Sequence, residues 1–117
     1  MSLHNLKYIH LILLIGDLES AKVILEKLNP IYKSDLTLST ELKSAFFNNY
    51  ASYYKKTEDY NAALELLEEA IKLDADSDIA LAVDCNNKAV LLMSMGKYKE
   101  AYRVSKRALV SLEPVVN

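Results

Sequence analysis

The chain alternates between long stretches with an apolar residue at every third or fourth position and short polar breaks, a pattern typical of amphipathic helices. One such stretch has its apolar residues at Ala63, Leu66, Leu67, Ala70 and Leu73. A later stretch has the same spacing at Ala101, Val104, Ala108 and Leu112. With only 2 Gly and 2 Pro, the chain has little material for the tight turns of a sheet. We therefore predict an all-α fold.

Three of the polar breaks share one pattern: a polar turn, a large apolar residue, two further residues and an alanine. These breaks lie at residues 16–21, 58–63 and 96–101. A further helical stretch precedes each break, at residues 3–15, 40–56 and 79–95. The pattern predicts a single domain, residues 1–117, of three antiparallel helical hairpins at residues 3–28, 40–73 and 79–112.

Two connectors join the hairpins, at residues 29–39 and 74–78. We expect Asn29 and Pro30 to end the second helix, because proline lacks a backbone N–H and disfavours helical geometry in the residue before it. Thr37 or Ser39 is then available to cap the next helix. The second connector contains capping residues but no strong breaker, so the helices on either side of it are expected to be long.

The middle hairpin resembles the tetratricopeptide repeat (TPR) family, through Phe47, Tyr50, Ala51, Tyr54, Ala63, Leu67 and Ala70. The third hairpin has this pattern at Cys85, Ala89, Leu92, Gly96, Tyr98, Ala101 and Ala108, and departs from it at Lys88 and Ser105. The first hairpin matches at Tyr8, Ile12, Gly16, Leu18, Ala21 and Leu25, with Ile9 in place of a small residue. The marker alanines Ala21, Ala63 and Ala101 are 42 and 38 residues apart, similar to the long repeats of kinesin light chains and bacterial peptide sensors.

This resemblance implies that the three hairpins stack as a short right-handed superhelix, in which each hairpin buries its apolar face against the next. It also implies a non-enzymatic module that binds a peptide segment of a protein partner. The first helix of each hairpin is expected to line a concave groove, where an asparagine often holds the backbone of an extended peptide.

Paired asparagines recur one repeat apart in this sequence and are the main candidates for that role. A carboxamide offers both a donor and an acceptor, so it can pair with a peptide bond whatever the neighbouring side chain. The predicted peptide-binding residues are Asn48, Asn49, Asn86, Asn87, Ser52, Lys55, Lys56, His10, Val83 and Val90. We expect the two lysines to favour acidic side chains and the valines to take an apolar anchor. The alternative is that the asparagines form hydrogen bonds only between neighbouring helices.

Composition and charge exclude several other classes of protein. The 117 residues are 51% hydrophobic and 26% charged, as in an ordinary folded domain. The net charge of −2 argues against a nucleic-acid partner, because phosphate binding needs a concentrated positive surface. The apolar run at residues 8–15 is shorter than the roughly 20 residues of a membrane span. We therefore expect an intracellular, cytoplasmic protein with no membrane partner.

The sequence offers no arrangement of residues for catalysis or metal binding. His4 and His10 are six residues apart, so they do not share a helix face as a metal-binding pair would. Cys85 is the single cysteine and occupies a packing position of the repeat. The two glycines are isolated in the hairpin turns and form no phosphate-binding loop. We predict that the chain is not an enzyme and needs no cofactor or metal.

The last third of the chain supports a second hypothesis. Residues 85–117 hold six basic and two acidic residues, and the basic ones cluster at Lys97, Lys99, Arg103, Lys106 and Arg107. Apolar residues accompany them at Tyr102, Leu109, Val110, Val115 and Val116. Such a surface usually marks an interface. The alternative function is therefore a structural or oligomerisation module, either a homo-oligomer through its C-terminal helix or a fragment of a longer repeat array.

Overall fold

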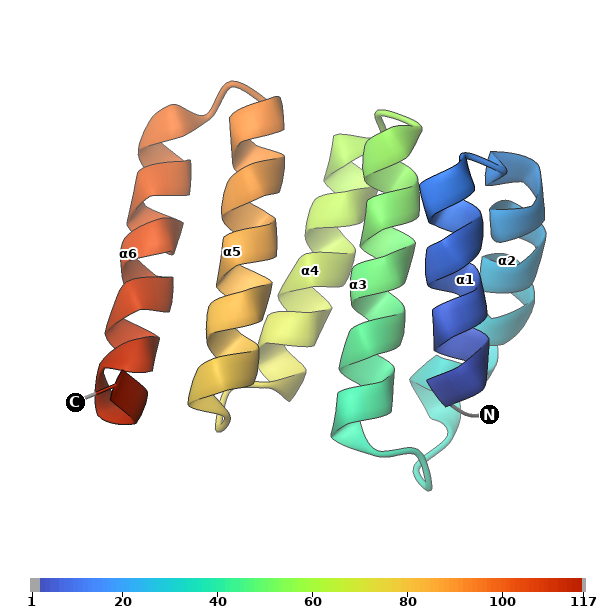
Figure 1. Cartoon of the computed structure of the whole chain (residues 1–117), viewed down its shortest axis with the longest axis horizontal. Coiled ribbons are helices and arrows are strands. Elements are labelled where there is room, and N and C mark those ends of the chain that lie inside the picture. The colour runs from blue at the N-terminus through green and yellow to red at the C-terminus, as the bar shows by residue number, and fades with distance from the viewer. Residues whose placement is uncertain (1–2, 117) are drawn as a thin grey trace.

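Six helices form three antiparallel hairpins in a row within the described part of the chain (Figure 1). The computed structural model describes the backbone of residues 3–116 and the side chains of residues 6–113. The helices are α1 (Leu3–Ile15), α2 (Leu18–Ser34), α3 (Thr40–Lys56), α4 (Tyr60–Leu73), α5 (Asp78–Ser94) and α6 (Tyr98–Val116). Residues 3–116 contain no strand. The predicted all-α fold of stacked hairpins is confirmed.

The hairpin turns depend on one left-handed residue each, at the start of the three polar breaks. Gly16 has a φ angle of 82° and Gly96 has 77°, a region that glycine enters without steric cost. The middle turn has Glu58 at the equivalent position, with a φ angle of 63°. Asp17 and Asp59 follow the first two of these residues and cap α2 and α4 through their side chains.

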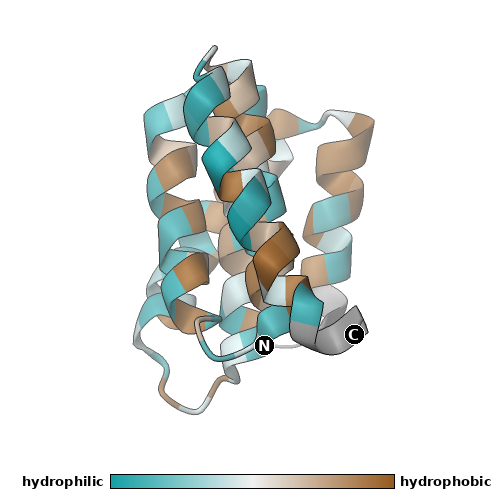
Figure 2. Cartoon of the chain, turned by 90° about the vertical axis from the view of Figure 1, so that its left-hand side faces the viewer, coloured by the Kyte–Doolittle hydropathy of each residue, from teal (hydrophilic) through white to brown (hydrophobic). Residues whose placement is uncertain are grey.

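The first helices of the three hairpins form one face of the molecule. In Figure 1, α1, α3 and α5 lie toward the viewer, and α2 and α4 lie behind them. Helix α3 occupies the centre, because it contacts both α1 and α5. Of the described helices, only α5 contacts α6. Figure 2 looks onto this end and shows that the outermost helix carries both hydrophobic and hydrophilic residues.

Small residues allow the helices to pack closely, as the repeat pattern predicts. Alanines at the marker positions are buried, among them Ala21, Ala51, Ala63, Ala70, Ala89 and Ala101. Aromatic rings fill the space between α2 and α3, where Phe46 contacts Tyr32, Phe47 and Tyr50. This combination of small and aromatic residues gives the first two hairpins one continuous core.

The predicted end of the second helix at Asn29 and Pro30 is wrong, because α2 continues through Pro30 to Ser34. The reason is Tyr32, which is fully buried and stacks on Phe46 with ring centroids 4.2 Å apart. Burying this ring stabilises the last turn enough to offset the backbone hydrogen bond that proline cannot donate. The first hairpin therefore extends beyond residue 28.

The helices predicted at residues 3–15, 40–56 and 79–95 agree with α1, α3 and α5 to within one residue at each end. Ser39 caps α3, since its Oγ accepts a hydrogen bond from the backbone N–H of Leu42 at 3.1 Å. Helix α6 runs to Val116, past the predicted end of the third hairpin at residue 112. The side chains of His4, Val115 and Val116, which enter the metal and interface hypotheses, lie outside the described residues.

Candidate functional site

Two adjoining pockets lie between α3 and α5 and share Asn48 and Asn87 in their walls. The larger has a volume of about 360 Å³ and is lined by Glu41, Ser44, Ala45, Asn48, Asn49, Asp74, Ala80, Val83, Asp84 and Asn87. The smaller has a volume of about 90 Å³ and is lined by Asn48, Ala51, Ser52, Lys55, Ala63, Leu67, Asn87, Val90 and Leu91. We name the surface formed by both pockets the α3–α5 groove.

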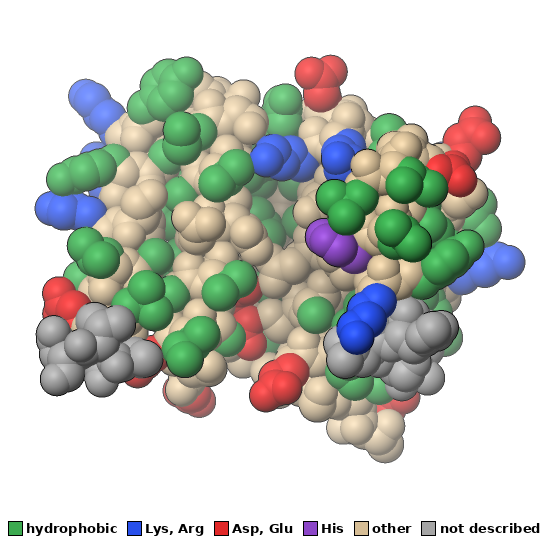
Figure 3. Space-filling view, viewed as in Figure 1, with side chains coloured by type: hydrophobic (Ala, Val, Ile, Leu, Met, Phe, Trp, Pro, Cys, Tyr) green, Lys and Arg blue, Asp and Glu red, His purple; other side chains and the backbone are tan. Residues whose placement is uncertain are grey.

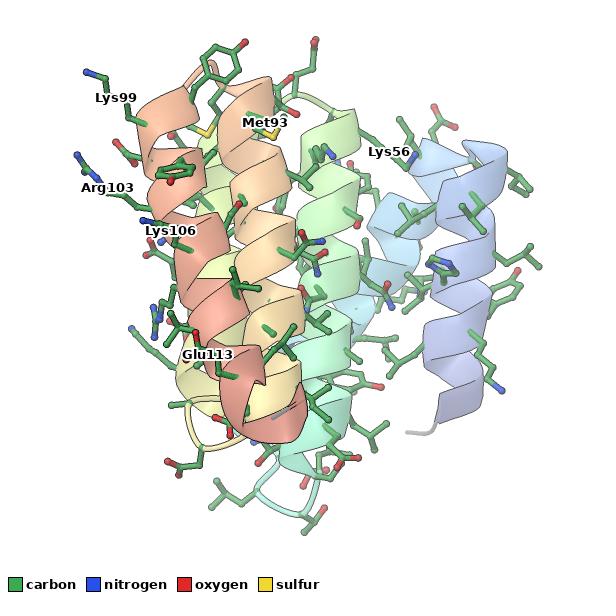
Figure 4. All side chains as sticks on the ribbon, turned by 60° about the vertical axis from the view of Figure 1, so that its left-hand side comes forward. Lys56, Met93, Lys99, Arg103, Lys106 and Glu113 are labelled. Atoms are coloured by element: carbon green, nitrogen blue, oxygen red, sulfur yellow. The ribbon has the colours of Figure 1, made fainter. Side chains whose placement is uncertain are left out.

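Most of the predicted peptide-binding residues meet in this groove. They are Asn48, Asn49, Ser52, Lys55, Val83, Asn87 and Val90. Asn86, Lys56 and His10 line neither pocket. Asn86 and His10 are exposed on α5 and α1, and Figure 4 places Lys56 at the end of α3. The structure therefore separates the ten candidates into a groove set and three residues outside it.

Two of the asparagines join α3 to α5. The Asn48 carboxamide donates through Nδ2 to the backbone oxygen of Ser44 at 3.0 Å and to Asp84 Oδ1 at 3.0 Å. Asn87 Nδ2 donates in turn to Asn48 Oδ1 at 2.9 Å. Asn48 and Asn87 therefore form hydrogen bonds between neighbouring helices, which was the alternative to a role in peptide binding. Among the described residues, the half-buried Asn49 carboxamide has no such partner, although it lines the same pocket.

A pair of buried carboxyl groups forms the floor of the larger pocket, and the sequence analysis missed it. Asp74 and Asp84 are buried together with Ser44, whose hydroxyl donates to Asp74 Oδ2. Burial, with the neighbouring Asp74 acting in the same direction, raises the pKa of Asp84 to about 7, although the bond from Asn48 acts to lower it. A signal existed in the sequence, because Asp84 interrupts an apolar run three residues after Leu81.

Cys85 follows Asp84 in α5 and is also buried. Burial raises the pKa of its thiol, and the nearby Arg107 lowers it by a smaller amount. A thiol with a raised pKa in an apolar site is a poor nucleophile. Cys85 therefore serves packing, as its position in the repeat predicts.

The departure from the repeat pattern at Lys88 has a structural explanation. Its ammonium group lies 3.4 Å from Glu68 Oε1 and is largely covered. This ion pair joins α5 to α4 where the repeat usually has an apolar contact. The exposed pair of Lys72 and Glu69, 3.7 Å apart within α4, contributes little by comparison.

A pocket of about 590 Å³ on the opposite side of the molecule is another feature that the sequence analysis missed. It is lined by Tyr32, Lys33, Lys43, Phe47, Glu65, Leu66, Glu68, Glu69, Lys72 and Leu73, from α2, α3 and α4. Three lysines and three glutamates line it, so its charges largely compensate one another. No sequence motif marks it, because its walls come from three helices.

The predicted basic cluster extends along exposed α6. Tyr98, Lys99, Tyr102, Arg103 and Lys106 line a shallow depression of about 480 Å³ there. The Lys106 ammonium lies 5.2 Å from the centre of the Tyr102 ring, within reach of a cation–π interaction. Leu109 and Val110 are 66% and 60% exposed on the same helix. Figure 4 shows Lys99, Arg103 and Lys106 pointing outward from α6.

Across the part of the chain that the structure describes, no three His, Cys, Asp or Glu side chains come together in a way that could hold a metal ion. None of the helices in that part is both long and apolar enough to cross a bilayer.

Comparisons with known proteins agree with the repeat assignment. Residues 44–77 match the family model described as tetratricopeptide repeat. Among solved structures, the chain is similar to BtubC (BKLC) from P. vanneervenii, with a TM-score of 0.72 and 19% sequence identity. The match covers 91% of this chain and 43% of the BtubC chain, so the two share a fold over less than half of the longer protein. A comparison with curated proteins gave no match in sequence.

Proposed function

We propose that the chain binds an extended segment of a protein partner in the α3–α5 groove, because residues 44–77 match the tetratricopeptide repeat model and lie within an array of three helical hairpins. Tetratricopeptide repeats generally mediate protein–protein interaction and are generally non-enzymatic. The observation that carries the proposal is the half-buried Asn49 carboxamide, which lines the groove with no partner among the described residues. The single, buried Cys85 fits a reducing compartment, so we place this module in the cytoplasm.

The two groove asparagines differ in what they offer a ligand. Asn49 offers both the donor and the acceptor of its carboxamide to a peptide backbone. Asn87 uses its Nδ2 to hold Asn48 and presents its oxygen as an acceptor. An extended peptide has a donor and an acceptor in each residue, so both asparagines can bind it without regard to its side chains.

The other groove residues supply selectivity for side chains. Lys55 lies six residues beyond Asn49 on α3, about 9 Å along the helix axis. This distance equals about three residues of extended peptide, so an acidic residue of the ligand can pair with Lys55 while its backbone contacts Asn49. Val83 and Val90 are 53% and 41% exposed, and an apolar ligand side chain would cover them.

The test uses twelve-residue random peptides displayed on phage and selected against the full chain at pH 8. We expect recovered peptides to bind with micromolar affinity, and Asn49→Ala with Asn87→Ala to weaken binding at least tenfold. Asn86→Ala is the matched control, because it removes the same group from an exposed position outside both pockets. Equal loss in the control, or no recovered peptide, would contradict the proposal.

The second candidate function is association through α6. The observation in its favour is the row of exposed apolar and aromatic side chains on a helix that, within the described residues, contacts only α5. In an array of repeats, such a face is normally covered by the next hairpin or by a partner. This function makes a different prediction about the mass of the protein in solution.

A further inference from the structure

The larger pocket of the α3–α5 groove is lined by acidic and neutral side chains. Its walls carry the carboxyl groups of Glu41, Asp74 and Asp84, and no lysine, arginine or histidine of the described residues lines it. Its volume of about 360 Å³ exceeds what the head group of one long side chain fills. The pocket is therefore a negatively charged recess open to the groove.

Hydrogen bonding inside the molecule leaves one of these acceptors unused. Asp84 is 1% exposed, and its Oδ1 accepts a bond from Asn48. Its Oδ2 has no donor among the described residues and lies beside the Asp74 carboxyl group. Asp74 is held in place by the Ser44 hydroxyl. A buried acceptor without a donor is costly, so a proton or another cation is needed between these carboxyl groups.

Glu41 on α3 and Asp74 at the end of α4 line the pocket together with Asp84. The basic groups of Lys88 on α5 and Arg107 on α6 act on the adjacent Cys85. Lys88 is already paired with Glu68, and neither Lys88 nor Arg107 lines the pocket. A cation that neutralises the Asp74 and Asp84 pair must therefore enter from the groove.

The groove is polarised along α3. Ser44 marks the acidic pocket and Lys55 lies eleven residues further along the helix, about 16 Å away. In Figure 3 the central part of this face shows Lys or Arg side chains toward its upper end, below an acidic side chain at the very top, and further Asp or Glu side chains near its lower end. A bound peptide therefore meets opposite charges at the two ends of the groove.

We propose that the larger pocket takes a lysine or arginine side chain of the bound peptide, with Asp84 as its counter-ion. The inference rests on the proposed function, because it identifies one residue of the ligand in the same groove. The ammonium or guanidinium group supplies the donor that Asp84 Oδ2 lacks. It displaces the proton shared by the two carboxyl groups, and that proton passes to solvent.

Release of this proton makes binding depend on pH. Below neutral pH the two carboxyl groups hold their shared proton, since the pKa of Asp84 is about 7, and this proton competes with the cationic group of the ligand. Affinity should therefore increase with pH and level off above neutrality. For one released proton, the change is about tenfold between pH 6 and pH 8.

The experiment uses the phage-selected twelve-residue peptides from the test above, measured by fluorescence anisotropy with the full chain. We expect them to share a basic residue, and its replacement by norleucine to weaken binding about tenfold at pH 8. Asp84→Asn should weaken binding of the original peptide by the same factor. The two changes together should reduce the affinity no more than either change alone. Asp76→Asn removes the same charge from the exposed connector and is the matched control.

The pH series on the unaltered chain needs no variant, so a folding defect in Asp84→Asn would not prevent the test. The tenfold change in affinity between pH 6 and pH 8 should vanish with the norleucine peptide. Histidine also changes charge in this range, so His10→Gln serves as a control, and the change in affinity should persist in it. Three results would overturn this inference and leave the proposed function standing. They are peptides that bind through Asn49 without a basic residue, losses of affinity from Asp84→Asn and from the norleucine peptide that add together, and an affinity that does not change with pH. Failure to recover any peptide would overturn both.

Discussion

Ionised Asp84 destabilises the folded chain, because it is buried beside a second carboxyl group. Its pKa is about 7 in the folded chain, above its ordinary value of 3.8. Between these values the folded state holds a proton that the unfolded state has released. Stability supplied by this proton is complete below the ordinary pKa and is lost as the pH rises toward 7.

Replacement of Asp84 by asparagine tests this account of stability. The new amide can donate to Asp74 while its oxygen accepts from Asn48, so the variant has no proton to lose. We expect Asp84→Asn to be more stable than the unaltered chain at pH 8, on the order of 4 kcal/mol, and about equal to it near pH 4. Thermal unfolding followed by circular dichroism from pH 4 to pH 8 measures the difference. An unchanged difference across this range would contradict the assigned pKa.

Sequence reasoning identified the groove asparagines as a group but not their separate roles. Asn48 and Asn49 are identical in type and adjacent, and only the register of α3 against α5 shows that Asn48 bonds Asp84 and Asn87. The pairing of Asp74 with Asp84 depends in the same way on how the connector between α4 and α5 folds back. A periodic pattern specifies the buried face of a helix, but it does not specify which polar groups meet across that face.

At the scale of elements, the aligned polar breaks predicted the hairpin turns correctly. The left-handed residue occupies the same repeat position in all three turns, at Gly16, Glu58 and Gly96. The failure at Pro30 has a different origin, because a local rule for helix ends takes no account of tertiary packing. The buried Tyr32 ring, two residues later, outweighs the local preference of proline.

Glu58 is the one described residue other than glycine with a positive φ angle, so its turn is strained. We expect Glu58→Gly to increase the free energy of unfolding by about 1 kcal/mol, because a left-handed residue with a side chain costs about that amount. Gly96→Ala should decrease it by a similar amount, since no neighbouring atom would contact the added Cβ and only the backbone cost remains. Urea denaturation measures both. A loss of stability in Glu58→Gly would contradict this account of the turn.

At the scale of the whole molecule, the two candidate functions use different surfaces. The α3–α5 groove lies on the face formed by the first helices, whereas the exposed apolar side chains of α6 lie at one end of the array. A symmetric dimer through α6 with its two-fold axis near Arg103 would bring Lys99, Arg103 and Lys106 of both copies together. Like charges at such short range oppose association.

We therefore expect a monomer of 13.2 kDa across a concentration series in low salt, measured by light scattering coupled to gel filtration. Leu109→Glu with Val110→Glu should leave both the mass and the helical content unchanged, because these two side chains are largely exposed. A stable dimer that these substitutions dissociate would favour the structural function instead.

NMR chemical-shift changes in the ¹⁵N-labelled full chain can map directly where a selected peptide binds. We expect the largest changes at the α3–α5 groove, around Asn49, Ser52 and Val83. Changes centred instead on Lys33 and Lys72 in the opposite pocket, or on α6, would contradict it.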